Sequence, residues 1–449
     1  MTASATASRD DRRAGPVRFE LQGGALGIVE SAPVVPLVSI VISMRSGAIA
    51  DPEGRDGLCR FAGRLLRRGC KGLSSPEIET SIDRLGAELG LDVGPSTMTL
   101  HGQVIRRNLR PFCELLARLL GTPTFDQEEL ARLRRESVAE IVEARDSDRS
   151  LASVALRRAL FAGHPYSRSA AGRCSTVETF TRDEAVAAYE KHFVRKDLVI
   201  GFAGAITEAE AKELGELLVS AMREGPSVTM TIPDPAPPEG RRLVFVDKPE
   251  RTQTQLLIGA LGTWPHDPDH FPLITATAIF GGTFTSRMMR EIRSKRGWSY
   301  GTSARLSIER KRHAFTMSAA PAAADCPPCL ALELDMLEAF VAKGVTEREL
   351  SFIKNYLVRS HAFEVDTAPK RLGQALEAEL LQLGPDYHAA FLEHVRGVKP
   401  EDANAAVAQR LHPANLYVVV VGTASELLDK VTASIPRLAG QDVVPFDRD

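Results

Sequence analysis

Each half of this chain ends with the same succession of an apolar strand, a glycine and an amphipathic helix. One copy starts at Asp197 and reads DLVIGFAGAITEAEAKELGELLVSA, and the other starts at Asn415 and reads NLYVVVVGTASELLDKVTASI, so that Gly204 falls on Gly422. The openings of the halves also agree, since LVSIVISMRSGAIADPEG and TQLLIGALGTWPHDPDH are both strands that run through glycine into a polar loop. A duplication at roughly two hundred residues is too long for a solenoid. It predicts an α+β fold of two homologous α/β-sandwich halves, each a mixed or antiparallel sheet with helices, that face each other. The alternative is a chance likeness between ordinary strand, turn and helix units.

A proline-rich stretch separates the two copies. Residues 223–242 read REGPSVTMTIPDPAPPEGRR, with five prolines and little apolar periodicity, which is typical of an extended linker. We therefore expect a flexible N-terminus over residues 1–16, a first domain over residues 17–222, the linker over residues 223–242 and a second domain over residues 243–449.

Charge and composition narrow the classes of partner and compartment. The chain has 449 residues, 44% of them hydrophobic and 25% charged, which is enough for more than one domain with a full core. The formal net charge is −2 and the two signs are interspersed, so no global field favours nucleic acid or an anionic membrane. The first residues lack the apolar region of a signal peptide, and no long apolar run follows, so we expect a cytoplasmic protein. We expect its six scattered cysteines to be reduced.

A helix with two different faces is predicted over residues 57–69. The segment reads GLCRFAGRLLRRG, and its apolar residues fall on one face at helical spacing. The other face carries Arg60, Gly63 and Arg64. Two histidines at i and i+4 would share one zinc ion on such a face, and a carboxylate before the second would act as a base. Guanidinium has no lone pair for a metal and stays protonated, so two arginines repel zinc and Gly63 offers no base.

This segment resembles the signature helix of the M16 (pitrilysin-like, mitochondrial processing peptidase-like) peptidase family, in which His-x-x-Glu-His follows Gly-Leu-x. Mapped residue by residue, Arg60 and Arg64 stand at the positions of two histidine ligands, and Gly63 stands at that of the catalytic glutamate. The resemblance extends from Val17 to Leu438 and implies a LuxS/MPP-like metallohydrolase fold.

The third zinc ligand of the family is a glutamate on a later helix, in a Glu-rich stretch that RRESVAEIVEARDSD resembles. Glu140 is the closest match, with Glu136 and Glu143 on nearby turns. One carboxylate alone does not make a metal site, so we expect a solvated or arginine-paired residue with Arg60 and Arg64 as candidate partners. The resemblance thus implies a degenerate zinc motif and no metal in this chain.

A second segment of resemblance lies in the second half. Residues 280–301 read FGGTFTSRMMREIRSKRGWSYG, which is similar to an M16 segment with a Gly-Gly loop, a Ser-Arg step, a helix and then Arg-Gly-x-x-Tyr. Gly281 and Gly282 are expected to form a flexible loop beside the chamber or a tight turn. Arg296 and Tyr300 match the last motif, whose arginine and tyrosine reach the substrate opposite the zinc in the family. The resemblance implies that Arg296 holds a peptide carbonyl or C-terminus and that Tyr300 donates to a developing oxyanion. The alternative is a surface arginine and a half-buried tyrosine in a turn.

Other patterns in the sequence give weaker indications of function. Cys326 and Cys329 have the spacing of a redox pair or half a zinc site, but no second CxxC or histidine pair completes four ligands. We expect them in the first turn of a helix. His266 and His270 are expected to be surface histidines, because neighbouring prolines predict a turn and a helix start there. The sequence has no Walker loop, dinucleotide fingerprint or Gly-x-Ser-x-Gly motif.

The resemblance is to half-length bacterial M16 chains that work in pairs, in which one subunit keeps the metal motif and the other keeps the Arg/Tyr motif. This chain matches the second type. We therefore expect the non-zinc subunit of a heterodimeric zinc metalloendopeptidase, inactive alone, with zinc in a homologous partner and a peptide or unfolded polypeptide as substrate. The alternative is a catalytically inert structural or peptide-binding homologue. Neither nucleic acid nor a membrane is an expected partner.

Overall fold

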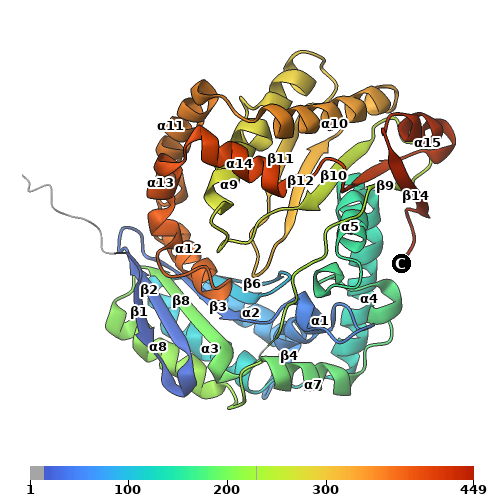
Figure 1. The fold of residues 1–449 in the computed structure, drawn as a ribbon. Coiled ribbons are helices and arrows are strands. Elements are labelled where there is room, and N and C mark those ends of the chain that lie inside the picture. Colours follow the sequence, from blue (N-terminus) through green and yellow to red (C-terminus); the bar gives the residue numbers. More distant parts are fainter. Residues whose placement is uncertain (1–14, 229) are drawn as a thin grey trace, which may run out of the picture.

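The computed structural model describes residues 15–228 and 230–449 and contains one six-stranded sheet in each half of the chain (Figure 1). The two α/β halves lie one above the other in that view, which confirms the predicted fold class. The N-terminus that we expected to be flexible lies almost wholly outside the described residues. None of the helices in the described ranges is long and apolar enough to cross a membrane.

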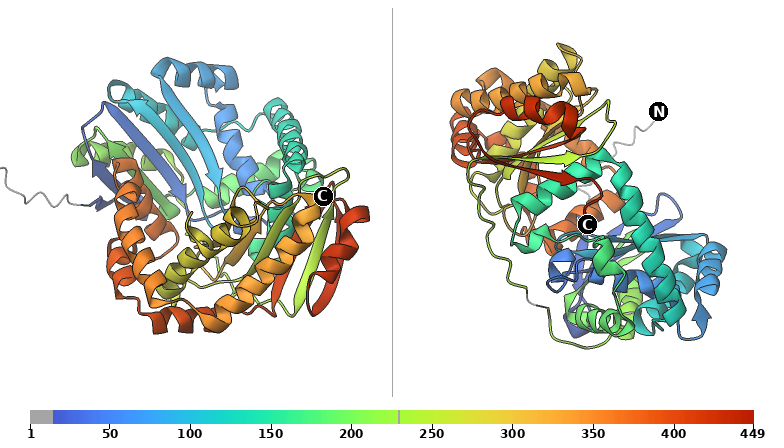
Figure 2. Two further views of the ribbon diagram at one scale, coloured as in Figure 1. Left: turned by 90° about the horizontal axis from the view of Figure 1, so that it is seen from above. Right: turned by 90° about the vertical axis from the view of Figure 1, so that its right-hand side faces the viewer.

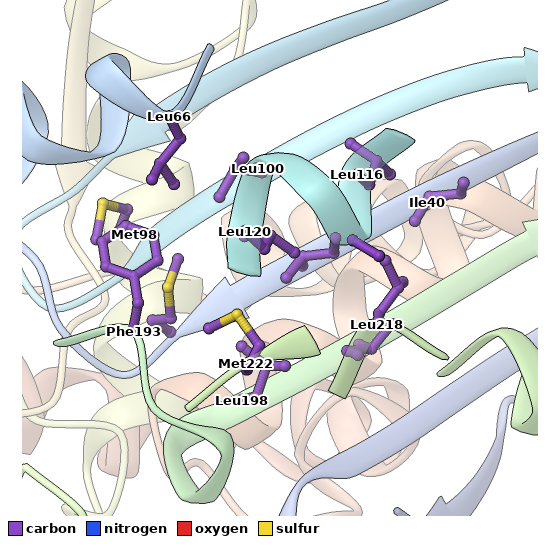
Figure 3. Packing of buried hydrophobic residues seen from close by; sticks show 14 of the residues in the cluster. Ile40, Leu66, Met98, Leu100, Leu116, Leu120, Phe193, Leu198, Leu218 and Met222 are labelled. Carbon is purple, nitrogen blue, oxygen red and sulfur yellow. The ribbon is translucent and has the colours of Figure 1, made fainter. Parts of the chain in front are cut away.

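The first sheet is mixed, with the strand order β1-β2-β8-β3-β7-β6. Its strands are β1 (Val17–Glu20), β2 (Leu26–Ser31), β3 (Leu37–Met44), β6 (Ala87–Val93), β7 (Met98–Ile105) and β8 (Leu198–Gly204). Strands β2 and β8 are parallel, and the other neighbours are antiparallel. One face is covered by α3 (Leu109–Gly121) and α8 (Glu208–Ala221), whose leucines share a buried cluster with Ile40 and Leu100 (Figure 3).

The second sheet is also mixed, with the order β11-β12-β10-β13-β9-β14. Its strands are β9 (Arg241–Asp247), β10 (Gln255–Leu261), β11 (Thr302–Leu306), β12 (Ala314–Ala319), β13 (Leu416–Gly422) and β14 (Leu438–Pro445). Strand β9 is parallel to both β13 and β14. The face away from the first half is covered by α10 (Cys326–Lys343), α14 (Pro400–Arg410) and α15 (Ala424–Ala433).

The two sheets repeat one topology. Read from the β14 edge, the second sheet runs β14-β9-β13-β10-β12-β11, which places β13 where β8 lies in the first sheet and β10 where β3 lies. The two strands that the sequence pairs, ending at Gly204 and Gly422, thus occupy equivalent central positions. The edges differ, because β1 is antiparallel to β2 whereas β14 is parallel to β9. The duplication that the sequence predicts is therefore present in the fold.

Each half places one helix on the sheet of the other half. Helix α5 (Asp148–Leu160) packs on β9, β10 and β13, and α12 (Ala368–Leu380) packs on β2 and β8 (Figure 1). Glycines make room for both helices: a Cβ at Gly259 would lie 2.5 Å from Leu156 of α5, and one at Gly201 would lie 2.9 Å from Leu372 of α12. Both faces of β8 and β13 are consequently buried, which explains why these strands are continuous apolar runs.

The proline-rich stretch is an extended connection. From Glu224 to Gly240 the described residues belong to no helix or strand, and the right-hand view of Figure 2 shows the chain running along one side of the molecule between the halves. Ile232 is buried in the cluster beneath α5, and Nε2 of His164 lies 2.9 Å from the carbonyl oxygen of Pro233. The domain boundaries at residues 222 and 243 stay a prediction, because α5 and α12 cross between the two sheets.

The remaining helices and strands belong to the two halves. They are α1 (Leu58–Leu65), β4 (Gly69–Cys70), β5 (Leu73–Ser74), α2 (Ser75–Leu85), α4 (Gln127–Glu143), α6 (Cys174–Val177), α7 (Arg182–His192), α9 (His270–Thr277), α11 (Glu347–Glu364) and α13 (Tyr387–Gly397). Strands β4 and β5 form a separate two-stranded sheet.

Candidate functional site

Helix α1, which carries the degenerate motif, is held at its start by a buried carboxylate. Gly57 precedes the helix with a φ of 93°, a conformation that favours glycine. The carboxylate oxygens of Asp51 accept hydrogen bonds from the backbone N–H groups of Gly57 and Cys59, each at 2.7 Å. Burial raises the pKa of Asp51 to about 6, so the acceptor is ionised at neutral pH. These bonds fix the rotation of α1, with its apolar face inward.

The opposite face of α1 is tied to α4 by two arginines that share one glutamate. Nη1 and Nη2 of Arg64 donate to the two carboxylate oxygens of Glu140 at 2.9 and 2.6 Å. Nη2 of Arg60 donates to the same carboxylate at 3.1 Å, and Nη1 of Arg64 also reaches Oγ of Ser137 at 3.1 Å. The structure thus pairs Glu140 with the two arginines that the sequence named as its candidate partners.

The two arginines keep the carboxylate of Glu140 ionised. Burial by itself would raise the pKa of Glu140, but the hydrogen bonds and charges of Arg64 and Arg60 together lower it below its usual range. Both oxygens of the carboxylate are occupied by guanidinium donors. Glu140 is therefore the acceptor of an ion-pair cluster formed by the residues that the resemblance aligns with the zinc ligands.

The residues at this cluster do not fit a zinc ion. Arginine supplies no lone pair, and the single carboxylate of Glu140 is already shared between two cations. At Gly63 a Cβ atom would lie 2.9 Å from both Leu91 Cδ2 and Met98 Sδ, so the position faces apolar side chains. Within residues 15–228 and 230–449, no group of three or more histidine, cysteine, aspartate or glutamate side chains is arranged to hold a metal ion.

Metal analysis tests this assignment directly. We expect the dialysed protein to carry no stoichiometric zinc, because two imidazoles are replaced by cations. As a positive control, the double variant Arg60→His/Arg64→His should gain about one zinc per chain, since both new imidazoles would lie beside Glu140 while Gly63, which faces Leu91 and Met98, stays unchanged. A parent protein that holds about one zinc and loses it in Glu140→Gln would show that our assignment of this cluster is wrong.

The other arginines near α1 are paired as well. Arg67 bonds Glu79, and Arg68 bonds Glu136. With Arg60 and Arg64 they line a pocket of about 520 Å³. Each of these guanidinium groups has a carboxylate partner, so the first half presents no free cationic site at this place.

The glycine pair of the second half differs from our expectation. We expected a loop or a tight turn at Gly281 and Gly282, but the two residues end a π-helical segment, Ala278–Gly282, that continues α9. A Cβ at Gly281 would lie 2.3 Å from the backbone nitrogen of Ala304 in β11. Glycine is needed there because the helix end lies directly against the sheet.

Arg296 is held by its own segment. Its Nη1 donates to the backbone carbonyl of Glu291 at 2.9 Å and to the Glu291 carboxylate at 3.2 Å. Its guanidinium carbon also lies 5.4 Å from the ring centroid of Trp298. The hydrogen bond from Lys295, followed by that from Arg296, lowers the pKa of Glu291 although burial opposes this shift. Both bonds are made by Nη1 of Arg296, and the described residues make no hydrogen bond to its Nη2 or Nε.

Tyr300 projects into solvent next to a second aromatic ring. Its side chain is 89% exposed and that of Phe284 is 71% exposed. The guanidinium of Arg293 lies between them, 4.9 Å from the Tyr300 ring centroid and 4.5 Å from that of Phe284. Cation–π contacts of this kind position the rings without burying them. The half-buried tyrosine of the alternative interpretation is therefore not what the structure shows.

A pocket of about 820 Å³ lies between α5 and strands β10, β11 and β12 of the second sheet. Gly281, Gly282 and Tyr300 line it, together with Phe284 and Arg293. Arg296 is not among its lining residues, and neither is any residue of the degenerate motif on α1. The structure therefore brings three of the four Arg/Tyr-segment candidates to one pocket and keeps the degenerate motif at another.

The sequence did not predict three further residues, one at the ion-pair cluster between α1 and α4 and two at the pocket beside Tyr300. Ser137 lies one helical turn before Glu140 on α4, so its bond to Arg64 follows from the helical period. Arg293 precedes Tyr300 in the same quoted segment, but no local pattern shows that it stacks between two rings. Arg157 of α5 lines the pocket from the other half of the chain, and only the tertiary structure brings it there.

The cysteine pair and the histidine pair, for which the sequence predicts no site, form no functional site in the described residues. Cys326 and Cys329 open α10, as expected, and both are buried free thiols whose pKa burial raises, to about 11 for Cys326. His266 is exposed, but the expectation of a surface histidine at His270 is wrong. That ring is fully buried, bonded to Thr263 at 2.8 Å and to the hydroxyl of Tyr387 at 2.7 Å.

Comparison with known proteins agrees with the fold. A model described as Insulinase (Peptidase family M16) matches residues 28–173, and one described as Peptidase M16 inactive domain matches residues 179–357. An uncharacterized zinc protease of Rickettsia bellii is 25% identical over 332 residues, or 74% of this chain and 79% of that protein. A protein of Helicobacter pylori described as the non-peptidase homolog YmxG is 20% identical over 396 residues, or 88% of this chain and 91% of that protein.

Solved structures show the same architecture. A peptidase M16 inactive domain from Pseudomonas fluorescens superposes with a TM-score of 0.84 at 23% identity, covering 91% of this chain and 98% of that one. The two family models together span most of the chain from Ile28 to Leu357. On this evidence the chain belongs to the M16 peptidase family, which includes members described as inactive or as non-peptidase homologues.

Proposed function

We propose that this chain is the non-zinc subunit of a two-chain M16 zinc peptidase and that it supplies Arg296 and Tyr300 to peptide bound at a partner's metal. One observation carries the proposal. Arg60, Arg64 and Glu140, which the resemblance aligns with the zinc ligands, form ion pairs with one another, whereas Tyr300 of the Arg/Tyr segment is open to solvent and lines a large pocket.

The side chains suit this division of work. Zinc in the partner would polarise the scissile carbonyl and activate a water molecule. The hydroxyl of Tyr300 has no partner in the chain to compete with a substrate oxygen, since the described residues make no hydrogen bond to it, and it can donate to a developing negative charge. Arg296 can exchange its bonds to Glu291 for a peptide carbonyl or carboxylate, because those bonds are at the surface and individually weak.

The alternative is a catalytically inert peptide-binding or structural homologue. Two observations favour it: Arg296 is engaged with Glu291, and similar proteins include an inactive domain and a non-peptidase homolog. Under this alternative the pocket and Tyr300 would still bind peptide, but no partner would acquire activity from the chain. A cytoplasmic location remains a prediction under both functions, and one structural relative is a periplasmic protease, PqqL of Escherichia coli.

Reconstitution tests the proposal. The isolated chain should leave unstructured peptides uncut, because the residues at its degenerate motif neither bind zinc nor supply a base. Mixing it with a homologous M16 subunit that carries His-x-x-Glu-His should give a stable heterodimer that cleaves those peptides and is stopped by a chelator. Size-exclusion chromatography and a quenched-fluorescence peptide assay make the measurement.

The outcomes separate the two functions. A heterodimer that is no more active than the zinc-bearing subunit alone would favour the inert homologue. Cleavage by the isolated chain that survives a chelator would indicate a different active site and overturn both.

A further inference from the structure

The pocket beside Tyr300 is lined by positively charged side chains and by no negatively charged ones. Four arginines line it, Arg149, Arg157, Arg293 and Arg305, and no aspartate or glutamate does. Among the residues that the structure describes, none of the four has a carboxylate within 4.0 Å. Charge is balanced over the chain as a whole, with 56 basic and 58 acidic residues, so a cationic wall of this kind is a local feature. It is the pattern expected where the missing anion comes from a ligand.

Arg157 carries the strongest sign of a missing ligand. Its Nε donates to the carbonyl of Ser167 at 3.4 Å, but its Nη2 atom is buried and has no hydrogen-bond partner in the described chain. Burial, followed by the charge of Arg158, lowers the pKa of Arg157 to about 10, which leaves the group protonated at neutral pH. Asp56 opposes this shift from a distance, but a buried guanidinium nitrogen that makes neither a hydrogen bond nor an ion pair is costly for a folded protein, and binding of an anion would relieve that cost.

Two neutral groups in the same pocket also lack partners. Oγ1 of Thr302, a side chain only 6% exposed, and Nδ1 of His313 are both buried without a hydrogen bond among the described residues. Burial lowers the pKa of His313 to about 4, so its ring is neutral and Nδ1 can donate in one tautomer. Together with Nη2 of Arg157 they give the pocket three unused polar groups of which each can donate, beside the apolar side chains of Leu156 and Phe161.

The arginine pocket on α1 provides an internal comparison. There Arg67 and Arg68 bond Glu79 and Glu136, so the chain neutralises its own cations. At the pocket beside Tyr300 the chain does not. Arginine in a pocket of this protein is therefore not always left unpaired. Of the two arginine-lined pockets compared, only the one beside Tyr300 has no carboxylate partner for its arginines among the described residues.

We infer that the pocket beside Tyr300 binds a carboxylate of the peptide, supplied either by an acidic side chain or by the C-terminus, and so gives the protein a preference for acidic peptides. A guanidinium matches the two oxygens of a carboxylate, and hydroxyl and imidazole donors can complete the set. The apolar wall suits the remainder of a peptide, and Tyr300 lies on the same pocket. The inference rests on the proposed peptide-binding role, but it needs neither the partner nor cleavage.

Fluorescence anisotropy with the isolated chain tests the inference. The probes are labelled unstructured peptides of equal length: one rich in aspartate and glutamate, its asparagine and glutamine counterpart, and a neutral peptide made with either a free or an amidated C-terminus. We expect the acidic peptide to bind about 10–100-fold more tightly than its amide counterpart, the range that one charge-assisted hydrogen bond provides. If the C-terminus is the source, the free-acid form of the neutral peptide should show that preference over the amidated form instead.

Variants show whether the preference arises in this pocket. Arg157→Met should remove most of it, and Arg157→Lys should keep part of it because the charge remains. The double variant Arg149→Gln/Arg305→Gln should weaken it. Arg110→Gln is the matched control, since this arginine is exposed, bonds Glu213 and lies on α3 away from the pocket, and it should change nothing. Melting temperatures check folding, and Arg157→Met should be no less stable than the parent, because it removes an unpaired buried charge.

The results that overturn the inference are distinct from those that overturn the proposed function. Equal binding of the acid and amide forms of both peptide pairs, or a preference that persists in Arg157→Met, would show that no carboxylate binds here. A chain that prefers acidic peptides but gives no activity to a zinc-bearing subunit would leave the inference standing and contradict the proposed function. A chain that gives activity to a zinc-bearing subunit but shows no preference for acidic peptides would contradict only the inference.

Discussion

In the assembled two-chain peptidase, Arg296→Ala and Tyr300→Phe should each lower kcat/KM by about 10²–10³, the usual cost of losing one donor to an oxyanion. Both variants should fold and pair normally. The hydroxyl of Tyr300 is removed from a side chain that is 89% exposed, and Arg296 loses only bonds to Glu291 in its own segment. A surface hydrogen bond contributes on the order of 1 kcal/mol to folding or less, so the effects on rate and stability are separable.

The measurement pairs kcat/KM on one peptide substrate with thermal melts of the heterodimer. Arg290→Ala is the matched control for the arginine, because Arg290 is exposed and also contacts the Glu291 carboxylate, at 3.4 Å, but lies outside the Arg-Gly-x-x-Tyr motif. Tyr356→Phe, on the exposed face of α11, is the control for the tyrosine. If the two motif variants match their controls in turnover, the motif is inherited without function and the inert homologue becomes the better account.

Replacing Glu333 should stabilise the protein by several kcal/mol and remove part of its pH dependence. The side chain is fully buried on α10 in the core of the second half, and neither carboxylate oxygen has a partner among the described residues. Burial raises its pKa to about 8. The folded protein thus binds a proton that the unfolded chain releases above pH 4.5, and the free energy of unfolding falls by up to about 1.4 kcal/mol per pH unit between those two values.

Urea unfolding at several pH values between 5 and 8.5 measures this effect, with roughly linear dependence on urea at each pH. Glu333→Leu should be the most stable variant, by roughly 2–4 kcal/mol at pH 8, because it removes the titration and the unpaired oxygens. Glu333→Gln should lose the pH slope but keep a buried polar group without partners. Asp335→Asn, an exposed change on the same helix, is the control. An unchanged slope in Glu333→Leu would show that Glu333 does not titrate as described.

Local patterns in the sequence predict the repeated architecture and the fate of the metal motif. The strands that end at Gly204 and Gly422 occupy equivalent places in the two sheets, because a continuous apolar strand followed by glycine and an amphipathic helix is a local signal that survives divergence. The helical period alone places Arg60 and Arg64 on one face of α1. The chemistry of two guanidinium groups by itself excludes zinc there, and the place of Glu140 in a resembling helix is enough to name it as their partner.

Only the tertiary structure decided which surfaces meet. An apolar helix face shows that a helix is buried, but not on which sheet, so the crossing of α5 and α12 between the halves could not be read from periodicity. The same limit explains the errors at His270 and at Gly281–Gly282, where burial and a helix end result from packing against distant segments. The pocket beside Tyr300 is the clearest case: Arg157 comes from the first half and His313 from the second, and a site assembled from long-range contacts leaves no trace in the local spacing of residues.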